Sequence, residues 1–299
     1  MKSTIKEKIN SFQEQNKNRA RLLIHCHDQP GIVAAVSEFL FQHHANITES
    51  NQYTTDPEGG EFFIRLDFEC PDLHHKRTQL EQDFRPIAEK FKMEWQFTYV
   101  ESVKNMAVFV SQEPHCLLEL LWEWQSGDLM ADIALVISNH ETTRDIVESL
   151  GIPFYYIPAN KDIRAEVEAK QLQLLEEYEV DFIVLARYMQ ILTPSFVAAH
   201  PNRIINIHHS FLPAFVGAKP YERAYNRGVK LIGATSHYVT NDLDEGPIIE
   251  QDIGRVNHRD NVERLKKMGQ AIERSVLARA VKWHIEDRII VHGNKTIVF

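Results

Sequence analysis

The hydrophobic pattern of residues 20–102 predicts a small mixed domain. The apolar run RLLIHCH predicts a strand, DQPG a turn, and IVAAVSEFLFQHH a helix, because its apolar side chains recur at helical spacing. Two strands follow in ANITESNQYTT and EFFIRLDFEC, then a helix in HKRTQLEQDFRPIAEKFK and a strand in EWQFTYV. The order β-α-β-β-α-β is that of a ferredoxin-like α+β sandwich.

A different pattern begins near residue 103. Short apolar strands alternate with long helical segments; they are AVFVS, DIALVIS, PFYYIP, DFIVLA, RIINIH and LIGATSHYV, with a strand-like IIEQDIG after them. Near-continuous apolar strands separated by helices predict a mostly parallel, Rossmann-like sheet covered on both faces, with its ligand site at the carboxyl ends of the strands. We therefore divide the chain into a polar leader (1–19), a first domain (20–102) and a second domain (103–299).

Composition excludes several classes of protein. Lys and Arg number 33 against 42 Asp and Glu, a net charge of −9, which disfavours nucleic acid as a partner. No apolar run is long enough to span a membrane and the N-terminus lacks a signal stretch, so we expect a cytoplasmic protein with no membrane partner. The three cysteines, Cys26, Cys70 and Cys116, are widely spaced and favour neither disulfides nor a cysteine zinc site.

The candidate chemistry lies in two segments of the second domain. Asn206 and His208 are two apart on a predicted strand, so their side chains share a face. Asp244 lies in the turn-rich loop 240–247 that follows SHYV. An amide, an imidazole and a carboxylate suffice for acyl transfer without a metal or a nucleophilic serine. Each residue taken alone fits a structural role as well.

The motifs N-I-H, S-F-L-P and S-H-Y-V-T-x-D-L-D-E-G-P-I-I resemble the formyltransferase family that uses 10-formyltetrahydrofolate, over residues 105–299. The resemblance implies that Asn206, His208 and Asp244 are catalytic. It also implies folate contacts, either as ligand wall or as core, at Met189, Ile191, Leu192, Val239 and Thr240, and a role for His237 in orienting the aspartate or a water, or a structural one.

One segment departs from the ribonucleotide transferases of that family, which hold a substrate phosphate in a glycine-rich loop after the first strand. Here that place reads Ser111-Gln112-Glu113-Pro114-His115-Cys116, with no glycine, one N–H donor fewer and an added negative charge. A phosphorylated acceptor is therefore disfavoured, and water is the simplest acceptor.

With water as acceptor, the whole chain resembles the formyltetrahydrofolate deformylase family. The resemblance implies hydrolysis of 10-formyltetrahydrofolate to formate and tetrahydrofolate, which supplies formate for purine synthesis and balances the one-carbon pool, with no cofactor besides the folate substrate. Asp244 would position and deprotonate water, Asn206 would donate to the oxyanion, and His208 would stabilise it or carry a proton. The loop Lys219-Pro220-Tyr221 either closes over the water or carries a solvated lysine.

The first domain, with Asp28-Gln29-Pro30-Gly31-Ile32 after its first strand, resembles an ACT domain. The resemblance implies an amino-acid effector, methionine or glycine, near Asp28, Gly31 and Ile32, and a homo-oligomer. The alternative interpretation of this segment is a turn that only connects a strand to a helix.

Three rival functions remain open. A formyltransferase acting on a small amine would use the same residues; the tRNA-directed type would add a basic domain, whereas this chain is acidic. A non-catalytic amino-acid sensor would not need all three polar residues. A metal hydrolase is suggested by 15 histidines and the pairs His43-His44, His74-His75 and His208-His209, but no H-E-x-x-H set appears, so we expect no metal.

Overall fold

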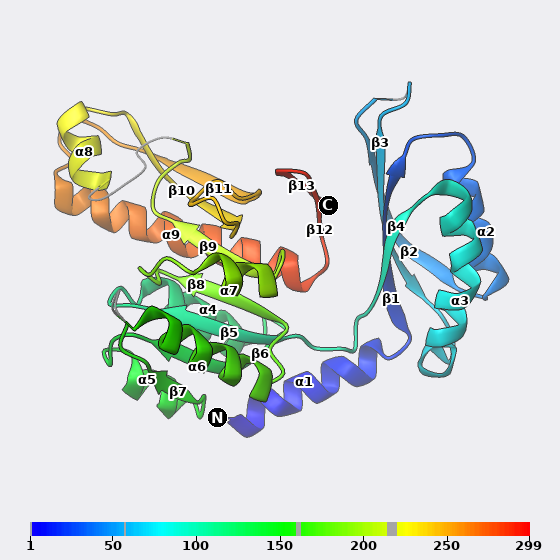
Figure 1. Ribbon diagram of the computed structural model, residues 1–299, viewed down its shortest axis with the longest axis horizontal. Helices are drawn as coiled ribbons and strands as arrows, with labels where there is room; N and C mark the ends of the chain where they lie inside the picture. Colours follow the sequence, from blue (N-terminus) through cyan, green and yellow to red (C-terminus); the bar gives the residue numbers. More distant parts are fainter. Residues whose placement is uncertain (1, 57, 160–162, 214–219) are drawn as a thin grey trace. The chain divides into compact units, whose positions relative to one another are not determined.

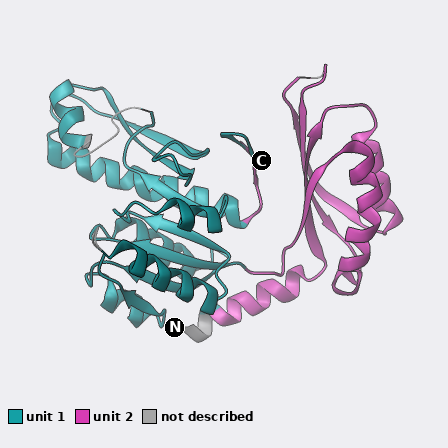
Figure 2. Cartoon of the chain, viewed as in Figure 1, with its two compact units in different colours: residues 1–5, 104–285, 291–296 teal, residues 6–103, 286–290, 297–299 magenta. Residues whose placement is uncertain are grey.

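The computed structural model describes residues 2–56, 58–159, 163–213 and 220–299. The chain forms two compact units (Figure 2), one of residues 6–103, 286–290 and 297–299 and the other of residues 1–5, 104–285 and 291–296. We call them the N-terminal and the C-terminal unit. The last stretches of the chain thus belong partly to the N-terminal unit, whereas the hydrophobic pattern had assigned all of 103–299 to the second domain.

The N-terminal unit is an α+β sandwich with a four-stranded antiparallel sheet in the order β2-β3-β1-β4. Its elements are β1 (Arg19–His27), α2 (Ile32–Gln42), β2 (Asn46–Thr54), β3 (Glu61–Glu69), α3 (Leu73–Phe91) and β4 (Glu94–Tyr99). Both helices cover one face of the sheet (Figure 1), where residues such as Val36, Phe68 and Phe84 form the core. The expected order β-α-β-β-α-β is confirmed.

The other face of this sheet is covered by the end of the chain. Leu23 and Phe63 pack with Ile290, Ile297 and Phe299. This contact explains why nearly all of β3 is buried rather than only alternate residues. The leader forms a helix, α1 (Lys2–Asn16). Near its end the Gln13 amide donates to the Glu101 carbonyl at 3.1 Å.

The C-terminal unit contains a seven-stranded sheet in the order β11-β10-β9-β8-β5-β6-β7. Strands β5 to β9 are parallel, and β10 and β11 are antiparallel additions at one edge, so the sheet is mostly parallel as expected. Its strands are β5 (Asn105–Val110), β6 (Asp132–Ser138), β7 (Phe154–Tyr156), β8 (Phe182–Ala186), β9 (Ile204–His208), β10 (Leu231–Tyr238) and β11 (Ile248–Arg255).

Helices cover both faces of this sheet (Figure 1), because its strands are apolar on both sides. They are α4 (His115–Ser126), α5 (Arg144–Ser149), α6 (Arg164–Glu177), α7 (Pro194–Ala199) and α9 (Val262–Ile285), whereas α8 (Pro220–Arg227) packs on α9. The long α9 packs on β9, β10, β11 and α4. A hairpin of β12 (Ile289–His292) and β13 (Lys295–Val298) ends the chain.

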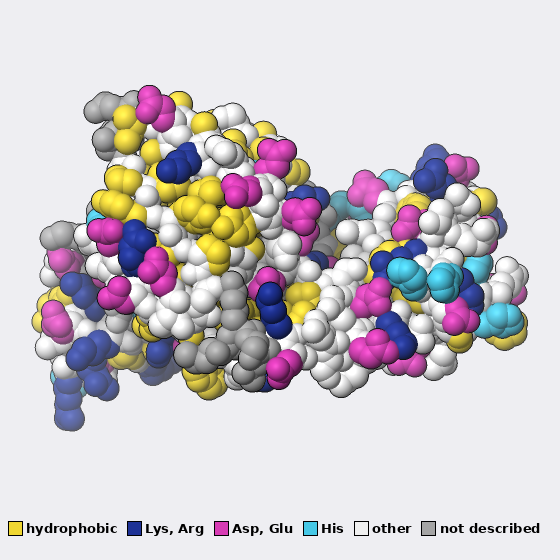
Figure 3. Space-filling model, turned by 90° about the horizontal axis from the view of Figure 1, so that it is seen from below, with side chains coloured by type: hydrophobic (Ala, Val, Ile, Leu, Met, Phe, Trp, Pro, Cys, Tyr) yellow, Lys and Arg dark blue, Asp and Glu magenta, His cyan; other side chains and the backbone are white. Residues whose placement is uncertain are grey.

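Two surface features bear on possible partners. Acidic and basic side chains are interspersed on the face shown in Figure 3 instead of forming one basic area. Within the described part of the chain, no helix combines the length and the apolar character that a membrane span requires.

Candidate active site

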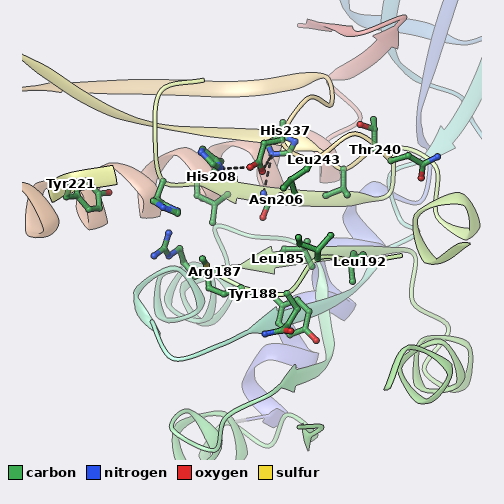
Figure 4. Close-up of a pocket in the computed structure, with 18 of the residues that line it drawn as sticks. Leu185, Arg187, Tyr188, Leu192, Asn206, His208, Tyr221, His237, Thr240 and Leu243 are labelled. Carbon is green, nitrogen blue, oxygen red and sulfur yellow. Dashed lines mark hydrogen bonds and ion pairs between the residues drawn. The ribbon is translucent and has the colours of Figure 1, made fainter. Parts of the chain in front are cut away.

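A cavity of about 560 Å³ opens in the C-terminal unit beside β8 and β9. It is lined by the three residues predicted to be catalytic, by the five predicted folate contacts and by His237. It lies where the sequence placed the ligand, at the carboxyl ends of parallel strands. Figure 4 shows Asn206, His208 and His237 converging on one side, with Leu185 and Leu192 from β8 and the following loop on another.

The pairing of β9 with β10 positions the polar group. The strands are antiparallel, with Asn206 opposite His237 and His208 opposite Thr235. A register shift between Ser236 and His237 in the pairing of β10 with β11 changes the direction of the strand at this point. The Asn206 amide nitrogen consequently lies 3.2 Å from His237 Nε2.

The hydrogen bonds of His237 assign its tautomer. Nδ1 lies 2.9 Å from the Tyr238 carbonyl oxygen, which can only accept. Nδ1 therefore carries the proton, and Nε2 accepts from the Asn206 amide. One N–H of the Asn206 amide is then used within the protein, and the other has no partner among the described residues and can donate to a ligand oxygen.

Asp244 reaches the two histidines from the loop after β10. Its Oδ2 lies 3.2 Å from His208 Nδ1 and its Oδ1 lies 3.7 Å from His237 Nε2. Burial alone would raise the pKa of Asp244, but the hydrogen bond with His208 holds that pKa well below its usual range. Asp244 is therefore an ionised carboxylate at neutral pH.

The loop that carries Asp244 depends on a close backbone approach. Gly246 passes so near to β10 that a Cβ there would lie 1.8 Å from the Tyr238 carbonyl oxygen. Asp244 itself has a φ of 58°, a left-handed conformation that Asp tolerates better than most residues. The sequence D-E-G thus aims the carboxylate at β9.

Apolar side chains form the rest of the cavity wall. Met189 and Ile191, in the loop after β8, are 58% and 56% exposed, and Leu243 opposite them is 59% exposed. Large apolar side chains exposed around one cavity are typical of a ligand site. The loop is anchored by hydrogen bonds from the Met189 N–H to Ser111 Oγ (3.1 Å) and from the Thr193 N–H to Glu168 Oε1 (2.8 Å).

A buried polar cluster adjoins the cavity and was missed by sequence reasoning. Glu273, on α9 and 1% exposed, accepts from Tyr221 Oη at 2.5 Å and lies 2.8 Å from His115 Nε2. Arg187 Nε lies 3.5 Å from the same carboxylate. Burial raises the pKa of Glu273, but His115, Arg187 and Tyr221 outweigh it and lower that pKa overall. Arg187 and Tyr221 also line the cavity.

His115 of this cluster lies in the segment 111–116, which the sequence analysis compared with the phosphate loop of the transferases. His115 begins α4, whose N-cap position is Pro114 and has no side-chain cap. His115 is directed to Glu273, and the Cys116 side chain is fully buried. Tyr221, predicted to lie in a loop, is part of α8; Lys219 lies outside the described residues.

Two groups of side chains in the described ranges place three possible metal-ligand atoms within 4.8 Å, and one of them belongs to this cluster: His115, Cys116 and Glu273. His115 and Glu273 are already joined by a hydrogen bond. Burial and the Glu273 carboxylate raise the pKa of the Cys116 thiol well above its usual range. These residues suit hydrogen bonding better than metal ligation, because Cys116 would have to be a thiolate to bind a metal.

The predicted effector residues lie in the N-terminal unit. Gly31 precedes α2 with a φ of 95°, and Ile32 is buried at the start of that helix. Asp28 Oδ2 accepts a hydrogen bond from Thr54 Oγ1 at 2.8 Å, and the Asp28 N–H donates to the Gly60 carbonyl at 2.7 Å. Asp28 thus joins the β1–α2 turn to β2 and β3.

Known proteins resemble both units. A formyl transferase family model matches residues 104–281, and an ACT domain model matches residues 20–85. A formyltetrahydrofolate deformylase of Bacillus subtilis is 69% identical over 299 residues, covering 100% of both chains.

Solved structures of deformylases and of ribonucleotide transformylases also match this chain. The crystal structure of a formyltetrahydrofolate deformylase from Pseudomonas syringae matches with a TM-score of 0.89 and 47% identity, covering 94% of each chain. A glycinamide ribonucleotide transformylase from Symbiobacterium toebii matches with a TM-score of 0.62 and 30% identity, covering 66% of this chain and 94% of its own.

Proposed function

The chain belongs to the formyltetrahydrofolate deformylase family, and we propose that Asn206, His208 and Asp244 carry out its hydrolysis of 10-formyltetrahydrofolate to formate and tetrahydrofolate. The observation that carries the proposal is that these three side chains line one largely apolar cavity, where Asp244 contacts His208 and His237 holds Asn206. The apolar wall suits the folate, and the polar group faces the bond to be broken.

His208 is the proton carrier in this mechanism. Its Nδ1 faces the ionised Asp244, so Nδ1 holds a proton and Nε2 is the basic atom. Nε2 is buried and has no hydrogen-bond partner among the described residues. Nε2 takes a proton from the attacking water as the water oxygen bonds to the formyl carbon, and returns it to the folate nitrogen as the C–N bond breaks.

Asp244 orients His208 and the water. A carboxylate whose pKa is held low by a hydrogen bond from His208 is a weak base, so proton transfer is assigned to the imidazole and not to Asp244. The negative charge of Asp244 stabilises His208 when it is doubly protonated, as an aspartate does for other catalytic histidines. This division of roles keeps proton transfer as the role of His208 and departs from the sequence-based expectation that Asp244 deprotonates the water.

Asn206 stabilises the charge that develops on the formyl oxygen. Its second amide N–H is available to that oxygen, and a donor held in place by His237 loses no energy to reorganisation. Asn206→Ala is expected to lower kcat by about 10²–10³. Asn226→Ala, on the exposed surface of α8, is the control and should retain full activity. A kcat for Asn206→Ala close to that of the unaltered enzyme would refute the role.

Water is favoured over an amine as the acceptor. The segment 111–116 offers no glycine, and His115 is engaged with Glu273 instead of facing a ligand. These features support hydrolysis without transfer to a phosphorylated amine.

We propose that no metal or organic cofactor is needed, since the three side chains supply both the proton carrier and the oxyanion donor. Turnover should be unchanged in a strong chelator.

The N-terminal unit is proposed to bind a small amino acid and to join copies of the chain. The ACT match over residues 20–85 supports both proposals, with Asp28, Gly31 and Ile32 as the expected contacts and methionine or glycine as the effector. The edge strands β2 and β4 leave backbone groups for pairing with another copy. Calorimetry with each amino acid and sedimentation of the full chain test the two proposals separately.

A further inference from the structure

Two of the three guanidinium nitrogens of Arg187 have hydrogen-bonding capacity that is not used by the described residues. The side chain lines the cavity and is 13% exposed. Nε and Nη1 are both buried, and neither has a hydrogen-bond partner in residues 2–56, 58–159, 163–213 and 220–299. A buried donor without a partner costs about 1–3 kcal/mol, and more when it is charged. Such an atom in a cavity wall indicates a ligand that accepts from it.

The backbone and Glu273 hold Arg187 in this position. Arg187 follows β8 in a left-handed conformation with a φ of 62°. Its own N–H donates to the Leu185 carbonyl at 3.1 Å. Glu273 lies 3.5 Å from Nε, too far for a hydrogen bond, and its carboxylate already has Tyr221 and His115 as partners. Glu273 therefore orients the guanidinium of Arg187 without accepting a hydrogen bond from its Nε or Nη1.

The neighbouring groups define what could bind. Figure 4 shows Arg187, His208 and Tyr221 on one side of the cavity, and Leu192 and Thr240 on the other. The apolar side suits the large folate, which leaves the Arg187 side for a small group. His209 also lines the cavity, with its ring centroid 6.4 Å from that of Tyr221; burial, Arg187 and His208 lower its pKa to about 4, so it is neutral at pH 7 and Arg187 supplies the positive charge.

We propose that Arg187 forms a carboxylate subsite that takes the formate released in hydrolysis. Formate is the smallest carboxylate, and carboxylate oxygens are favoured acceptors for guanidinium N–H groups. The identification of formate rests on the proposed function, whereas binding of a small carboxylate at Arg187 does not.

Binding is measured on the full chain without folate. Sodium formate is titrated at constant ionic strength against sodium chloride, and the broadening of the 13C-formate signal gives the Kd. The unaltered protein should bind formate saturably, and Arg187→Gln should weaken binding at least tenfold. Arg187→Lys, which keeps the charge but not the planar guanidinium, should weaken it several-fold. The control Arg264→Gln, on the exposed part of α9, should bind as the unaltered protein does.

Product inhibition gives a second readout. Added formate should inhibit turnover of the unaltered enzyme, and the inhibition constant should rise at least tenfold in Arg187→Gln, measured against whatever turnover the variant retains. If Arg187→Gln does not fold, formate binding and inhibition are compared between Arg187→Lys and the unaltered protein, and that comparison tests the proposal. The proposal is overturned if formate does not bind, if chloride or phosphate competes equally well, or if both variants bind formate normally. Normal formate binding by a chain that releases no formate from 10-formyltetrahydrofolate would overturn the proposed function and leave the subsite standing.

Discussion

Gly269→Ala tests the buried cluster beside the active site. Gly269 lies inside the 24-residue helix α9, where Ala would normally be favoured by about 1 kcal/mol. The Tyr221 ring occupies the space of the missing side chain, because a Cβ at Gly269 would lie 2.0 Å from Tyr221 Oη and 2.3 Å from its Cζ. The ring crosses α9 there to reach Glu273, one helical turn further on.

The expected magnitude follows from these contacts. Displacing Tyr221 removes a hydrogen bond to a buried carboxylate, which contributes about 1.5–3 kcal/mol. The better helix propensity of Ala returns about 1 kcal/mol. With the loss of ring packing added, Gly269→Ala should lower the free energy of unfolding by about 1–3 kcal/mol. It should also lower kcat/KM, since Glu273 orients Arg187 at the cavity wall.

A double-mutant cycle with Tyr221→Ala separates displacement of the Tyr221 ring from any effect of Ala on the helix itself. In the Tyr221→Ala background the space beside α9 is empty, so Gly269→Ala should then stabilise the protein by up to about 1 kcal/mol. Urea unfolding followed by tryptophan fluorescence measures all four proteins. A stabilising Gly269→Ala in the unaltered background, or the same effect in both backgrounds, would refute the packing argument.

Two further predictions concern pH and binding. The pKa of His209 is near 6.5 in the unfolded chain and about 4 in the folded protein, so its contribution to stability is complete above pH 6.5 and falls by up to about 3 kcal/mol as the pH drops toward 4. Urea unfolding between pH 7 and 4 should therefore show a smaller loss of stability in His209→Asn than in the unaltered protein. Parallel curves for the two proteins would contradict the assignment. Ile191→Ala removes apolar surface from the cavity wall and should raise KM about tenfold with little change in kcat; an unchanged KM would place the folate elsewhere.

Much of the fold was predictable because it follows from hydrophobic patterns. The strands from β1 to β11 coincide with apolar or alternating runs, and the i, i+2 spacing correctly placed Asn206 and His208 on one face. Loop contacts do not follow from such patterns. That Asp244 reaches β9 depends on the close approach at Gly246, and only the family motif pointed to it from the sequence.

The buried cluster could not be derived from local pattern, because Arg187 and Glu273 come from distant segments. One signal was present: Glu273 lies on the apolar face of α9, one turn after Gly269 and shortly before Val276 and Leu277. A carboxylate in that position must find buried donors. The short hairpin β12–β13 and the packing of the chain end on the first sheet depend on tertiary contacts that have no periodic signature.

The central claim is that this cavity delivers the formyl group to water. This is tested by incubating the purified chain with 10-formyltetrahydrofolate and no amine, and by measuring the amounts of formate and tetrahydrofolate released together. Asp244→Asn is measured in parallel as the paired variant. We expect equal amounts of both products from the unaltered enzyme and almost none from Asp244→Asn, which keeps the shape of the side chain but lacks its charge. Folate binding without formate release, or equal release by both proteins, would contradict it.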